Sequence, residues 1–443
     1  MKTVTLQLFN RGQWWNAAEL SFGGNKMNSH VTLSYLPDYI RHVPRYDLSD
    51  SWACSVNAPV SIVPIDYPGW PALLDDLLPA GESRTWWLNY LNVSRSSAFE
   101  QSYALLTKAC MAPIGNLRIQ EAIEQINYDT AHRFPIESVV QLQHDFLEYA
   151  NEQGAAVGGA TGAGGAAPKL LLMVENNQVF IDGDFAGKAL SATPYLTKFA
   201  RNTRSPRDNN VLKAEGVFYQ ALAEILQGTD IETIDVDRLM VKEHQGQVSL
   251  WLPRFDVAIE NSVAARIGLE SIYSIINAAP GSYQNHLTVM HTVWERIRNT
   301  TQMSSFEFAT QYLARDLLNL VFGNSDNHGR NMSFLKFEND IRFAPIYDFA
   351  PMKADPEMVT RLFKWSDDCE RSGTVRFDQV VEKLSDFGEP DSLLAYLKNL
   401  ATPLIELPNL LTKLNCPEEI LEYPAIGFAN IHQKLVSYGV YHA

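Results

Sequence analysis

Two acidic residues and one amide in the last third of the chain have the types and spacing that phosphoryl transfer uses. Asp326 and Asn331 lie five residues apart in the polar run at 323–331, and a second acid, Asp348, follows at the end of a Pro-Ile-Tyr-Asp sequence. The apolar residues 332–337 between them predict a short strand and a turn. Phosphoryl transfer needs a divalent cation held by oxygen ligands and a carboxylate that orients the attacking hydroxyl. The pattern therefore predicts a metal–nucleotide site.

The same loop also has less specific interpretations. Ser-Asp-Asn-His-Gly at 325–329 could be a polar turn, although a turn alone does not explain the second acidic loop one hairpin away. His328 could brace the loop, contact phosphate or bind a metal, so that two acids and a histidine also resemble part of a metallohydrolase. Such sites usually need a further ligand, and none is obvious nearby. Arg330 could brace the loop, face phosphate or lie solvated on the surface.

A Gly/Ala-rich stretch at 154–168 is the strongest change of composition along the chain. Such sequence usually forms a flexible linker, but it could also form a glycine-rich turn whose N–H groups approach phosphate oxygens. The residues after it favour the turn, because Lys169 enters a predicted strand at 170–174 and another predicted strand lies at 179–181.

A lysine and a glutamate further along could complete this site. Lys198 lies in a predicted strand at 195–199, and Glu215 lies near the start of a predicted helix at 214–226. Kinase-like folds pair a strand lysine with a helix glutamate and so hold the ammonium against the nucleotide phosphates. Taken alone, the two could be an unrelated surface lysine and helix glutamate. Their place between the glycine-rich stretch and the Pro-Arg-Phe-Asp sequence at 253–256 favours the paired interpretation.

The remaining pattern predicts a strand-rich beginning and a helical end. Alternating residues at 3–9 and a short apolar run at 60–65 predict strands. The residues after Asp348 predict mostly helices. Helices are further predicted over 70–78, 85–91, 136–151 and 305–322, and a strand over 248–252.

Composition limits the class of protein. The chain has 443 residues, of which 46% are hydrophobic and 20% charged, so we expect a packed interior and two or three domains. A net charge of −15 argues against a chain-wide attraction to nucleic acid or anionic lipid. The four cysteines form no paired spacing, which indicates neither a zinc ribbon nor a disulfide framework. No apolar run reaches the roughly 18 residues of a membrane span, and the first residues lack a signal-peptide core. We expect a cytoplasmic protein without membrane contact.

With these motifs in order, the chain resembles the HipA family of bacterial Ser/Thr kinases, the toxins of HipBA-type toxin–antitoxin pairs. The resemblance covers most of the length and is modest near the N-terminus. Its strongest part is residues 326–331 together with 345–348. The other similar segments are 58–62, 73–79, 164–169 (similar to the phosphate-binding loop and its lysine), 215–219 (the helix glutamate) and 253–256 (the hinge).

The resemblance implies roles for individual residues. Asp326 would accept the proton of the substrate hydroxyl, and Asn331 and Asp348 would hold Mg²⁺. Lys198, with Glu215, would contact the ATP phosphates, and main-chain groups of 253–255 would bind adenine. Family members can phosphorylate one of their own serines just before the phosphate loop; Gly162 stands at that position here, so the adjacent Thr161 is the possible site. The residues implied to bind ATP are Gly164, Gly165, Ala166, Ala167, Lys169, Lys198, Pro253, Arg254, Phe255, Asp256, His328, Arg330, Asn331, Tyr347 and Asp348.

We therefore expect an α+β, kinase-like (HipA-like) two-lobed fold with a β-rich N-terminal subdomain and a mostly helical C-terminal lobe. The predicted divisions are 1–150 for the N-terminal part, 151–256 for the mixed nucleotide-binding region and 257–443 for the catalytic lobe. The expected function is ATP- and Mg²⁺-dependent phosphorylation of a protein Ser or Thr by the toxin of a toxin–antitoxin pair. Its expected partner is a HipB-like antitoxin, through which alone it would meet DNA.

Two alternatives stay open at this point. A catalytically degenerate kinase fold could act only by binding a DNA-binding antitoxin. A metal-dependent hydrolase or nuclease could use Asp326, His328 and Asp348.

Overall fold

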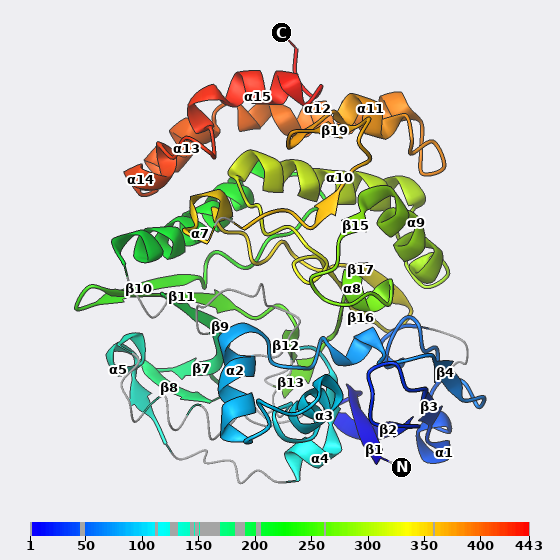
Figure 1. The fold of residues 1–443 in the computed structure, drawn as a ribbon. Coiled ribbons are helices and arrows are strands. Elements are labelled where there is room, and N and C mark those ends of the chain that lie inside the picture. Colours follow the sequence, from blue (N-terminus) through cyan, green and yellow to red (C-terminus); the bar gives the residue numbers. More distant parts are fainter. Residues whose placement is uncertain are drawn as a thin grey trace.

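The structure is a computed structural model; its upper part is mostly helical in Figure 1, and the two larger sheets lie in the lower part together with several short helices. It describes residues 2–44, 49–110, 114–124, 132–141, 146, 150, 169–181, 191–200, 205–260, 263–357 and 359–442. Within these residues, no helix combines the length and the apolar character that a membrane crossing requires. All four cysteines are free and buried, as their spacing predicts.

The N-terminal subdomain is a five-stranded antiparallel sheet covered by short helices. The sheet has the order β4-β3-β2-β1-β5. In β1 every second residue from Val4 to Leu8 is fully buried, which explains the alternation in the sequence. The strands are β1 (Lys2–Asn10), β2 (Gln13–Phe22), β3 (Val31–Tyr35), β4 (Ile65–Tyr67) and β5 (Leu117–Ile119). The helices are α1 (Pro37–Ile40), η1 (Ala72–Leu74), α2 (Gly81–Tyr90), α3 (Ala98–Lys108) and α4 (Gln120–Ile123).

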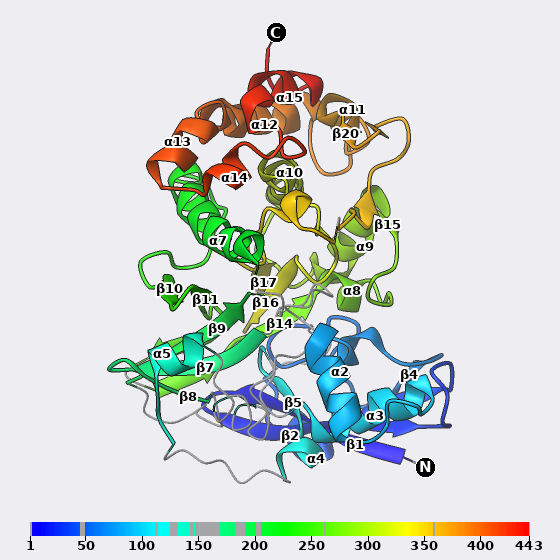
Figure 2. The ribbon, with the colours of Figure 1, turned by 60° about the vertical axis from the view of Figure 1, so that its left-hand side comes forward.

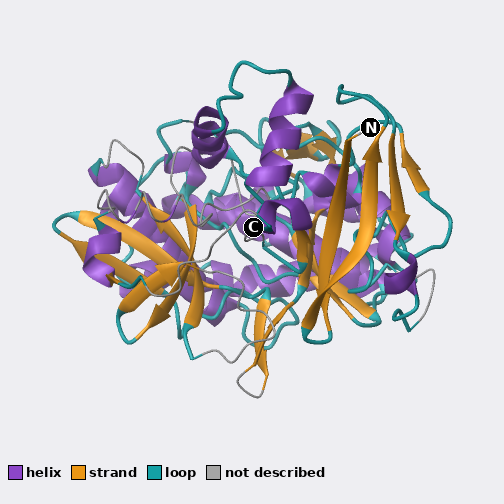
Figure 3. Cartoon of the chain, turned by 90° about the horizontal axis from the view of Figure 1, so that it is seen from below, coloured by secondary structure: helices purple, strands orange, loops and turns teal. Residues whose placement is uncertain are grey.

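A second, six-stranded sheet lies beside the first when the molecule is seen from below (Figure 3). Its order is β10-β11-β9-β7-β8-β6. The antiparallel register of β7 and β9 places Lys169 directly opposite Lys198. The elements of this region are β6 (Phe134–Pro135), α5 (Ile136–Val140), β7 (Lys169–Glu175), β8 (Gln178–Ile181), β9 (Thr193–Phe199), α7 (Pro206–Ile225), β10 (Met240–His244) and β11 (Gln247–Pro253).

Helix α7 joins this sheet to the rest of the molecule. It packs on β11 on one side and on α13 and α14 on the other (Figure 2). Ser205 and Asp208 form a capping box at its start, and Pro206 is its first residue. Its buried face, which includes Glu215 and Tyr219, therefore lies between the two lobes.

The C-terminal lobe is built around α10 (Ser305–Phe322), whose bounds match the prediction. Ser304 and Glu307 form a capping box at its start. Gly323 ends it with a φ of 75°, a left-handed conformation that glycine adopts without strain. The helix is buried in the largest core of the molecule. The surrounding helices are α8 (Ile272–Ile275), α9 (His286–Ile297), α11 (Phe377–Val381), α12 (Pro390–Leu404), α13 (Leu407–Lys413), α14 (Glu418–Leu421) and α15 (Ile431–Ser437).

A small sheet next to α10 positions the two acidic loops. Its order is β14-β16-β17, and the β16–β17 hairpin is the strand and turn predicted between Asp326 and Asp348. Its strands are β14 (Gly268–Ser271), β16 (Ser333–Phe337) and β17 (Asp340–Phe343). The other short elements are β12 (Val257–Glu260), β13 (Val263–Arg266), β15 (Gln284–Asn285), η3 (Met352–Ala354), β18 (Phe363–Lys364), β19 (Glu370–Arg371), β20 (Thr374–Val375) and η4 (Phe428–Asn430).

Two predicted elements near the N-terminus are wrong. In the predicted strand 60–65 only Ile65 belongs to a strand, and Ile62 and Val63 are 81% and 71% exposed. In the predicted helix 70–78 only the single 3₁₀ turn η1 forms. In both cases the apolar residues belong to loops that run over the first sheet, which local periodicity does not reveal.

Candidate active site

A buried cluster of ionic side chains lies where the second sheet meets the C-terminal lobe. The Nζ atom of Lys198 is 2.6 Å from Oε1 of Glu215 and also donates to the Asp348 carboxylate. Lys169 reaches the other Asp348 oxygen at 3.1 Å. The fold thus brings four predicted site residues together from β7, β9, α7 and the loop after β17.

Tyr219 completes this cluster and was not among the predicted site residues. Its hydroxyl donates to Oε1 of Glu215 at 3.1 Å and accepts the N–H of Phe349 at 3.1 Å. It therefore holds the helix glutamate and the loop that carries Asp348 at the same time. The spacing of four residues from Glu215, on one face of a helix, is the sequence signal that could have found it.

The Asp326 loop starts at the end of α10 and is tied to the Asp348 loop. The side chain of Asn324 donates to the main-chain oxygen of Asp348 at 3.2 Å and accepts the N–H of Asp326 at 3.2 Å. Asp348 itself has a φ of 52°, unusual for a residue other than glycine. Such strained positions persist where the surroundings fix them, and they are frequent at functional sites.

Asn331 presents an oxygen that nothing in the described structure satisfies. Its Nδ2 donates to the main-chain oxygen of Asp326 at 2.7 Å, whereas its Oδ1 is buried without a hydrogen-bond partner in the described residues. A buried polar atom without a partner is costly and needs an explanation. An amide oxygen together with the Asp348 carboxylate is the kind of oxygen set that Mg²⁺ takes, so the residues present fit this cation.

The pKa values of Asp326 and Asp348 are shifted in opposite directions. Burial and the charge of Asp348 raise the pKa of Asp326 to about 7. Burial opposes ionisation of Asp348 as well, yet the ammonium groups of Lys169 and Lys198 hold its pKa well below the usual range. Near neutral pH, Asp348 is therefore ionised while Asp326 can exchange a proton.

His328 acts as a brace of the loop. Burial lowers its pKa to about 4, so the imidazole is neutral at pH 7. Its Nδ1 accepts the N–H of Arg330 at 3.2 Å, and its Nε2 lies 3.4 Å from Oδ1 of Asp326. Within the described residues there is no group of three His, Cys, Asp or Glu side chains that could hold a metal, so the metallohydrolase alternative gains no support.

Arg330 and Tyr347 fix the loop from two sides. The Arg330 guanidinium donates through Nη2 to the main-chain oxygen of Asp75 at 2.9 Å, which links the loop to the N-terminal subdomain. The Tyr347 hydroxyl donates to the main-chain oxygen of Arg330 at 2.5 Å. Among the roles left open for Arg330, the structure shows the bracing one.

A slot with mostly apolar walls opens beside the ionic cluster. The space between its walls is about 410 Å³, including space that is open to solvent. Lys198 and Asp348 lie on its lining together with the 253–256 segment. Its apolar walls come from Ile114, Leu196, Ile234, Leu252, Phe255 and Tyr347. Ile114 belongs to the N-terminal part of the chain, so no local motif predicts its presence here.

The 253–256 segment differs in detail from the expectation. Pro253 has no N–H, and the N–H of Arg254 donates to the Pro194 oxygen at 3.1 Å. The Arg254 side chain forms two hydrogen bonds to Asp256, of 2.9 and 2.5 Å, and Asp256 also accepts the Gly115 N–H at 2.7 Å. The side chains of Arg254 and Asp256 therefore hold the segment in place. The main-chain oxygen of Asp256 is also used, since it accepts the N–H of Ile267 at 2.8 Å.

Part of the predicted site lies outside the described residues. This holds for the predicted phosphate loop, of which only Lys169 is described, and for the possible modification site Thr161. Their roles stay predictions. The predicted residues outside the described part are Gly164, Gly165, Ala166, Ala167 and Thr161.

Comparison with known proteins places these features in a family. The model of the HipA-like C-terminal domain matches residues 161–400, more than half of the chain. The chain belongs to the HipA-like family. A search of curated proteins gave no match.

The chain is also similar to solved structures. The HipA toxin of Shewanella oneidensis MR-1, in a complex with HipB and operator DNA, is similar with a TM-score of 0.65 and 16% identity over 99% of this chain and 97% of that one. A proinflammatory kinase of Helicobacter pylori, CtkA, gives a TM-score of 0.40 and 14% identity over 63% of this chain and 93% of that one. The match to the Shewanella toxin confirms the predicted HipA-like α+β fold.

Proposed function

We propose that this HipA-like chain is an ATP- and Mg²⁺-dependent kinase that transfers the γ-phosphate of ATP to a Ser or Thr hydroxyl of a protein. One observation carries the proposal. Lys198 is held between Glu215 and Asp348, and Asn331 Oδ1 and the Asp326 carboxylate belong to the same loop assembly. This is the set of groups that phosphoryl transfer needs.

The slot suits a nucleobase, and the cluster beside it suits the phosphates. A flat aromatic base gains from burial between apolar walls such as Leu196, Leu252 and Tyr347. Lys169 and Lys198 place two ammonium groups at one end of this slot, where a phosphate chain would continue. The Gly164–Lys169 stretch would cover that chain, as the family resemblance implies.

Asn331 and Asp348 are the residues that would hold Mg²⁺. The cation, when bound, would neutralise charge that develops on the phosphoryl oxygens. Asn331 contributes an oxygen that is already buried and unsatisfied, so little rearrangement of this side chain is needed. Asp348 contributes a carboxylate that stays ionised.

Asp326 is the residue that would orient and deprotonate the acceptor hydroxyl. A general base works best when its pKa lies near the working pH. Burial and Asp348 bring the pKa of Asp326 to about 7. His328, next to it and neutral, keeps the carboxylate oriented without adding a positive charge.

The partner is proposed from the family. The similar Shewanella toxin is seen with HipB and operator DNA, so a HipB-like antitoxin is the proposed partner of this chain. Contact with DNA would then be made by the complex, in keeping with a net charge of −15 on this chain. Autophosphorylation at Thr161 and a cytoplasmic location belong to the same proposal.

The experiment that tests the function combines binding with transfer. The purified full-length chain is incubated with γ-labelled ATP, Mg²⁺ and a library of Ser/Thr peptides, and labelled residues are mapped by mass spectrometry. Thermal shift with a non-hydrolysable ATP analogue and Mg²⁺ is measured in parallel. Asp348→Asn should abolish the Mg²⁺-dependent part of that shift and the label in peptides.

The same experiment separates the alternatives. A thermal shift without any label would favour a degenerate kinase fold that only binds its antitoxin. Metal-dependent cleavage of nucleic acid without ATP would favour a hydrolase. An absence of both nucleotide binding and transfer would reject the proposed function.

A further inference from the structure

A second and larger hollow leads away from Asp326 toward the N-terminal subdomain. The space in it is about 1570 Å³, including space that is open to solvent, and Asp326, His328 and Arg330 lie on its lining. The rest of the lining comes from Met27, from the loop after η1, from α2, α3 and α8, and from the segments around 280 and 360. We call this hollow the acceptor groove. It is distinct from the apolar slot, although both end at the loops that carry Asp326 and Asp348.

The walls of the acceptor groove suit an extended polypeptide. Two separate Pro/Ala/Gly runs contribute to its lining, residues 79–81 and residues 279–281. Small side chains let a second backbone come close, and the groove is open enough to admit one. Val359 and Leu362, both half-buried, add apolar surface for side chains of such a segment.

The charges on the groove lining balance one another. Within the described residues they are those of Asp326 and Arg330 on the 326–331 loop and of Asp75 and Arg84 on the N-terminal subdomain. Two guanidinium groups stand against two carboxylates. The chain as a whole has a net charge of −15, so the groove is less acidic than the chain.

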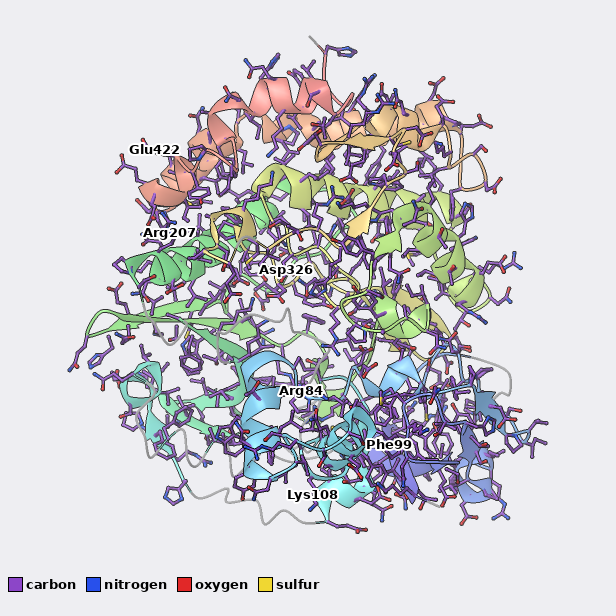
Figure 4. The ribbon with its side chains drawn as sticks, in the orientation of Figure 1. Arg84, Phe99, Lys108, Arg207, Asp326 and Glu422 are labelled. Carbon is purple, nitrogen blue, oxygen red and sulfur yellow. The ribbon has the colours of Figure 1, made fainter. Side chains whose placement is uncertain are left out.

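Arg84 is the cation of this groove that is held most loosely. Arg330 is bound to the Asp75 main chain at 2.9 Å, whereas Arg84 makes one long hydrogen bond of 3.4 Å, to Ser102 on α3. No carboxylate lies within ion-pair distance of Arg84 in the described part of the chain; burial lowers the pKa of Arg84, and the charge of Asp75 opposes that effect. It is half-buried on α2, and Figure 4 shows it on the side of α2 that lies toward Asp326. A guanidinium in such a place can take a carboxylate by two parallel hydrogen bonds.

We propose that the acceptor groove binds the protein substrate as an extended segment and that Arg84 selects an acidic side chain close to the Ser or Thr that Asp326 faces. This inference rests on the proposed kinase function and adds a specificity determinant to it. Arg84 touches neither the slot nor the ionic cluster around Lys198, so it acts on the choice of substrate and leaves the handling of ATP unchanged.

The test uses the full chain and a peptide library with one fixed Ser or Thr and one varied position at a time. Wild-type protein should label peptides with Asp or Glu at one position roughly tenfold better than those with Ala, a ratio that one charged hydrogen-bonded pair can supply. Arg84→Gln should abolish this preference. Arg84→Glu should reverse it in favour of Lys or Arg at the same position.

Two controls make the result specific. Arg95→Glu changes an exposed arginine in the loop between α2 and α3, outside the groove lining, and should keep the wild-type preference. The KM for ATP should be the same in all variants. A changed KM for ATP in Arg84→Gln would indicate a general disturbance of the fold and would overturn the specific role.

The possible failures are distinguishable. If wild-type protein labels peptides without an acidic preference, or if Arg84→Glu keeps that preference, the inference is wrong and the kinase function stands. If wild-type protein binds the ATP analogue but labels no peptide and no protein, the kinase function fails and the inference falls with it.

Discussion

Two buried lysine–carboxylate pairs in this molecule have the same chemistry and different surroundings. Lys336 and Glu270 are 3.1 Å apart where the C-terminal lobe meets the N-terminal subdomain. Every charged group there has protein partners: Lys336 also donates to the Ala53 oxygen, and Glu270 accepts from Ser55, Val56 and Ser274. The pair is complete and holds two subdomains together.

The pair of Lys198 and Glu215 is equally buried, but some polar groups near it lack partners or share them. Asp348 is shared with Lys169, Asn331 Oδ1 has no partner in the described residues, and Asp326 is held at a raised pKa. The contrast shows how a structural ion pair can be told from a functional one. Burial and charge are alike in both. Lys336 and Glu270 are enclosed by partners of their own, whereas the second pair shares Asp348 with Lys169 and lies in the same cluster of loops as Asn331 Oδ1, which has no partner in the described residues.

The most severe loss of activity is expected for Asp326→Asn. We expect a loss of peptide phosphorylation of about 10²- to 10⁴-fold, because an amide cannot accept the hydroxyl proton. Unfolding in urea should show unchanged or slightly raised stability, since a desolvated carboxylate is removed. Asp367 is exposed, so Asp367→Asn is the matched control and should keep full activity. Full activity of Asp326→Asn would remove the catalytic assignment.

Lys336→Met tests the structural pair. It leaves Glu270 buried without its counter-ion, and we expect a loss of about 3–5 kcal/mol in the free energy of unfolding. The thermal shift caused by the ATP analogue should keep its size, because the pair lies away from the slot. A variant that keeps its stability but no longer binds the nucleotide would show that the two pairs have been assigned the wrong way round.

The pH dependence gives a separate test of the functional pair and its surroundings. Asp326 binds its proton more tightly in the folded chain, since its pKa rises from 3.8 to about 7. Its contribution to stability is therefore fully present below pH 4 and is lost as the pH rises toward 7. The difference in unfolding free energy between wild type and Asp326→Asn, measured from pH 4 to 8, should follow this sign. Peptide phosphorylation should rise over the same range with a midpoint near 7, and a flat profile of both quantities would contradict the raised pKa.

The mildest change is expected for Tyr219→Phe. It removes one hydroxyl from Glu215 and leaves the Phe349 N–H buried without a partner, for a loss of about 1–3 kcal/mol in stability. The ATP analogue should also bind more weakly, because the Asp348 loop is less well held. Tyr39→Phe removes a buried hydroxyl from the Trp52 oxygen in the N-terminal subdomain and should lower stability without changing nucleotide binding. Equal nucleotide binding in both variants would place Tyr219 in the general core.

The sequence predicted best what is encoded locally. Helix α10 was predicted with the bounds that the structure has, because a capping residue, an apolar face and Gly323 all occur in order. Lys198 and Glu215 could be paired because their elements, β9 and α7, are consecutive along the chain. The predicted strand 60–65 failed because Ile62 and Val63 are exposed, and a short apolar run without alternation does not show that its residues are buried.

Local sequence patterns could not predict contacts between segments that are far apart in the chain. Ile114 lines the apolar slot and Arg84 the acceptor groove, yet both come from the N-terminal subdomain and have no motif around them. The bracing role of Arg330 depends on the Asp75 main chain, 255 residues away. Such partners are set by how the subdomains pack, which only the three-dimensional structure reveals.

The facing position of Lys169 and Lys198 on β7 and β9 affects how the crevice meets charged molecules. With Glu215 and Asp348 they form a quartet whose charges cancel, two of each sign. A polyanion that binds alone would add uncompensated negative charge to this quartet. A polyanion that binds together with a divalent cation would add less, because its anionic groups could pair with the lysines while the cation pairs with the carboxylates. Without a ligand, the quartet therefore exerts little long-range electrostatic attraction on phosphates. It favours ligands whose negative charge is already partly neutralised by a bound cation.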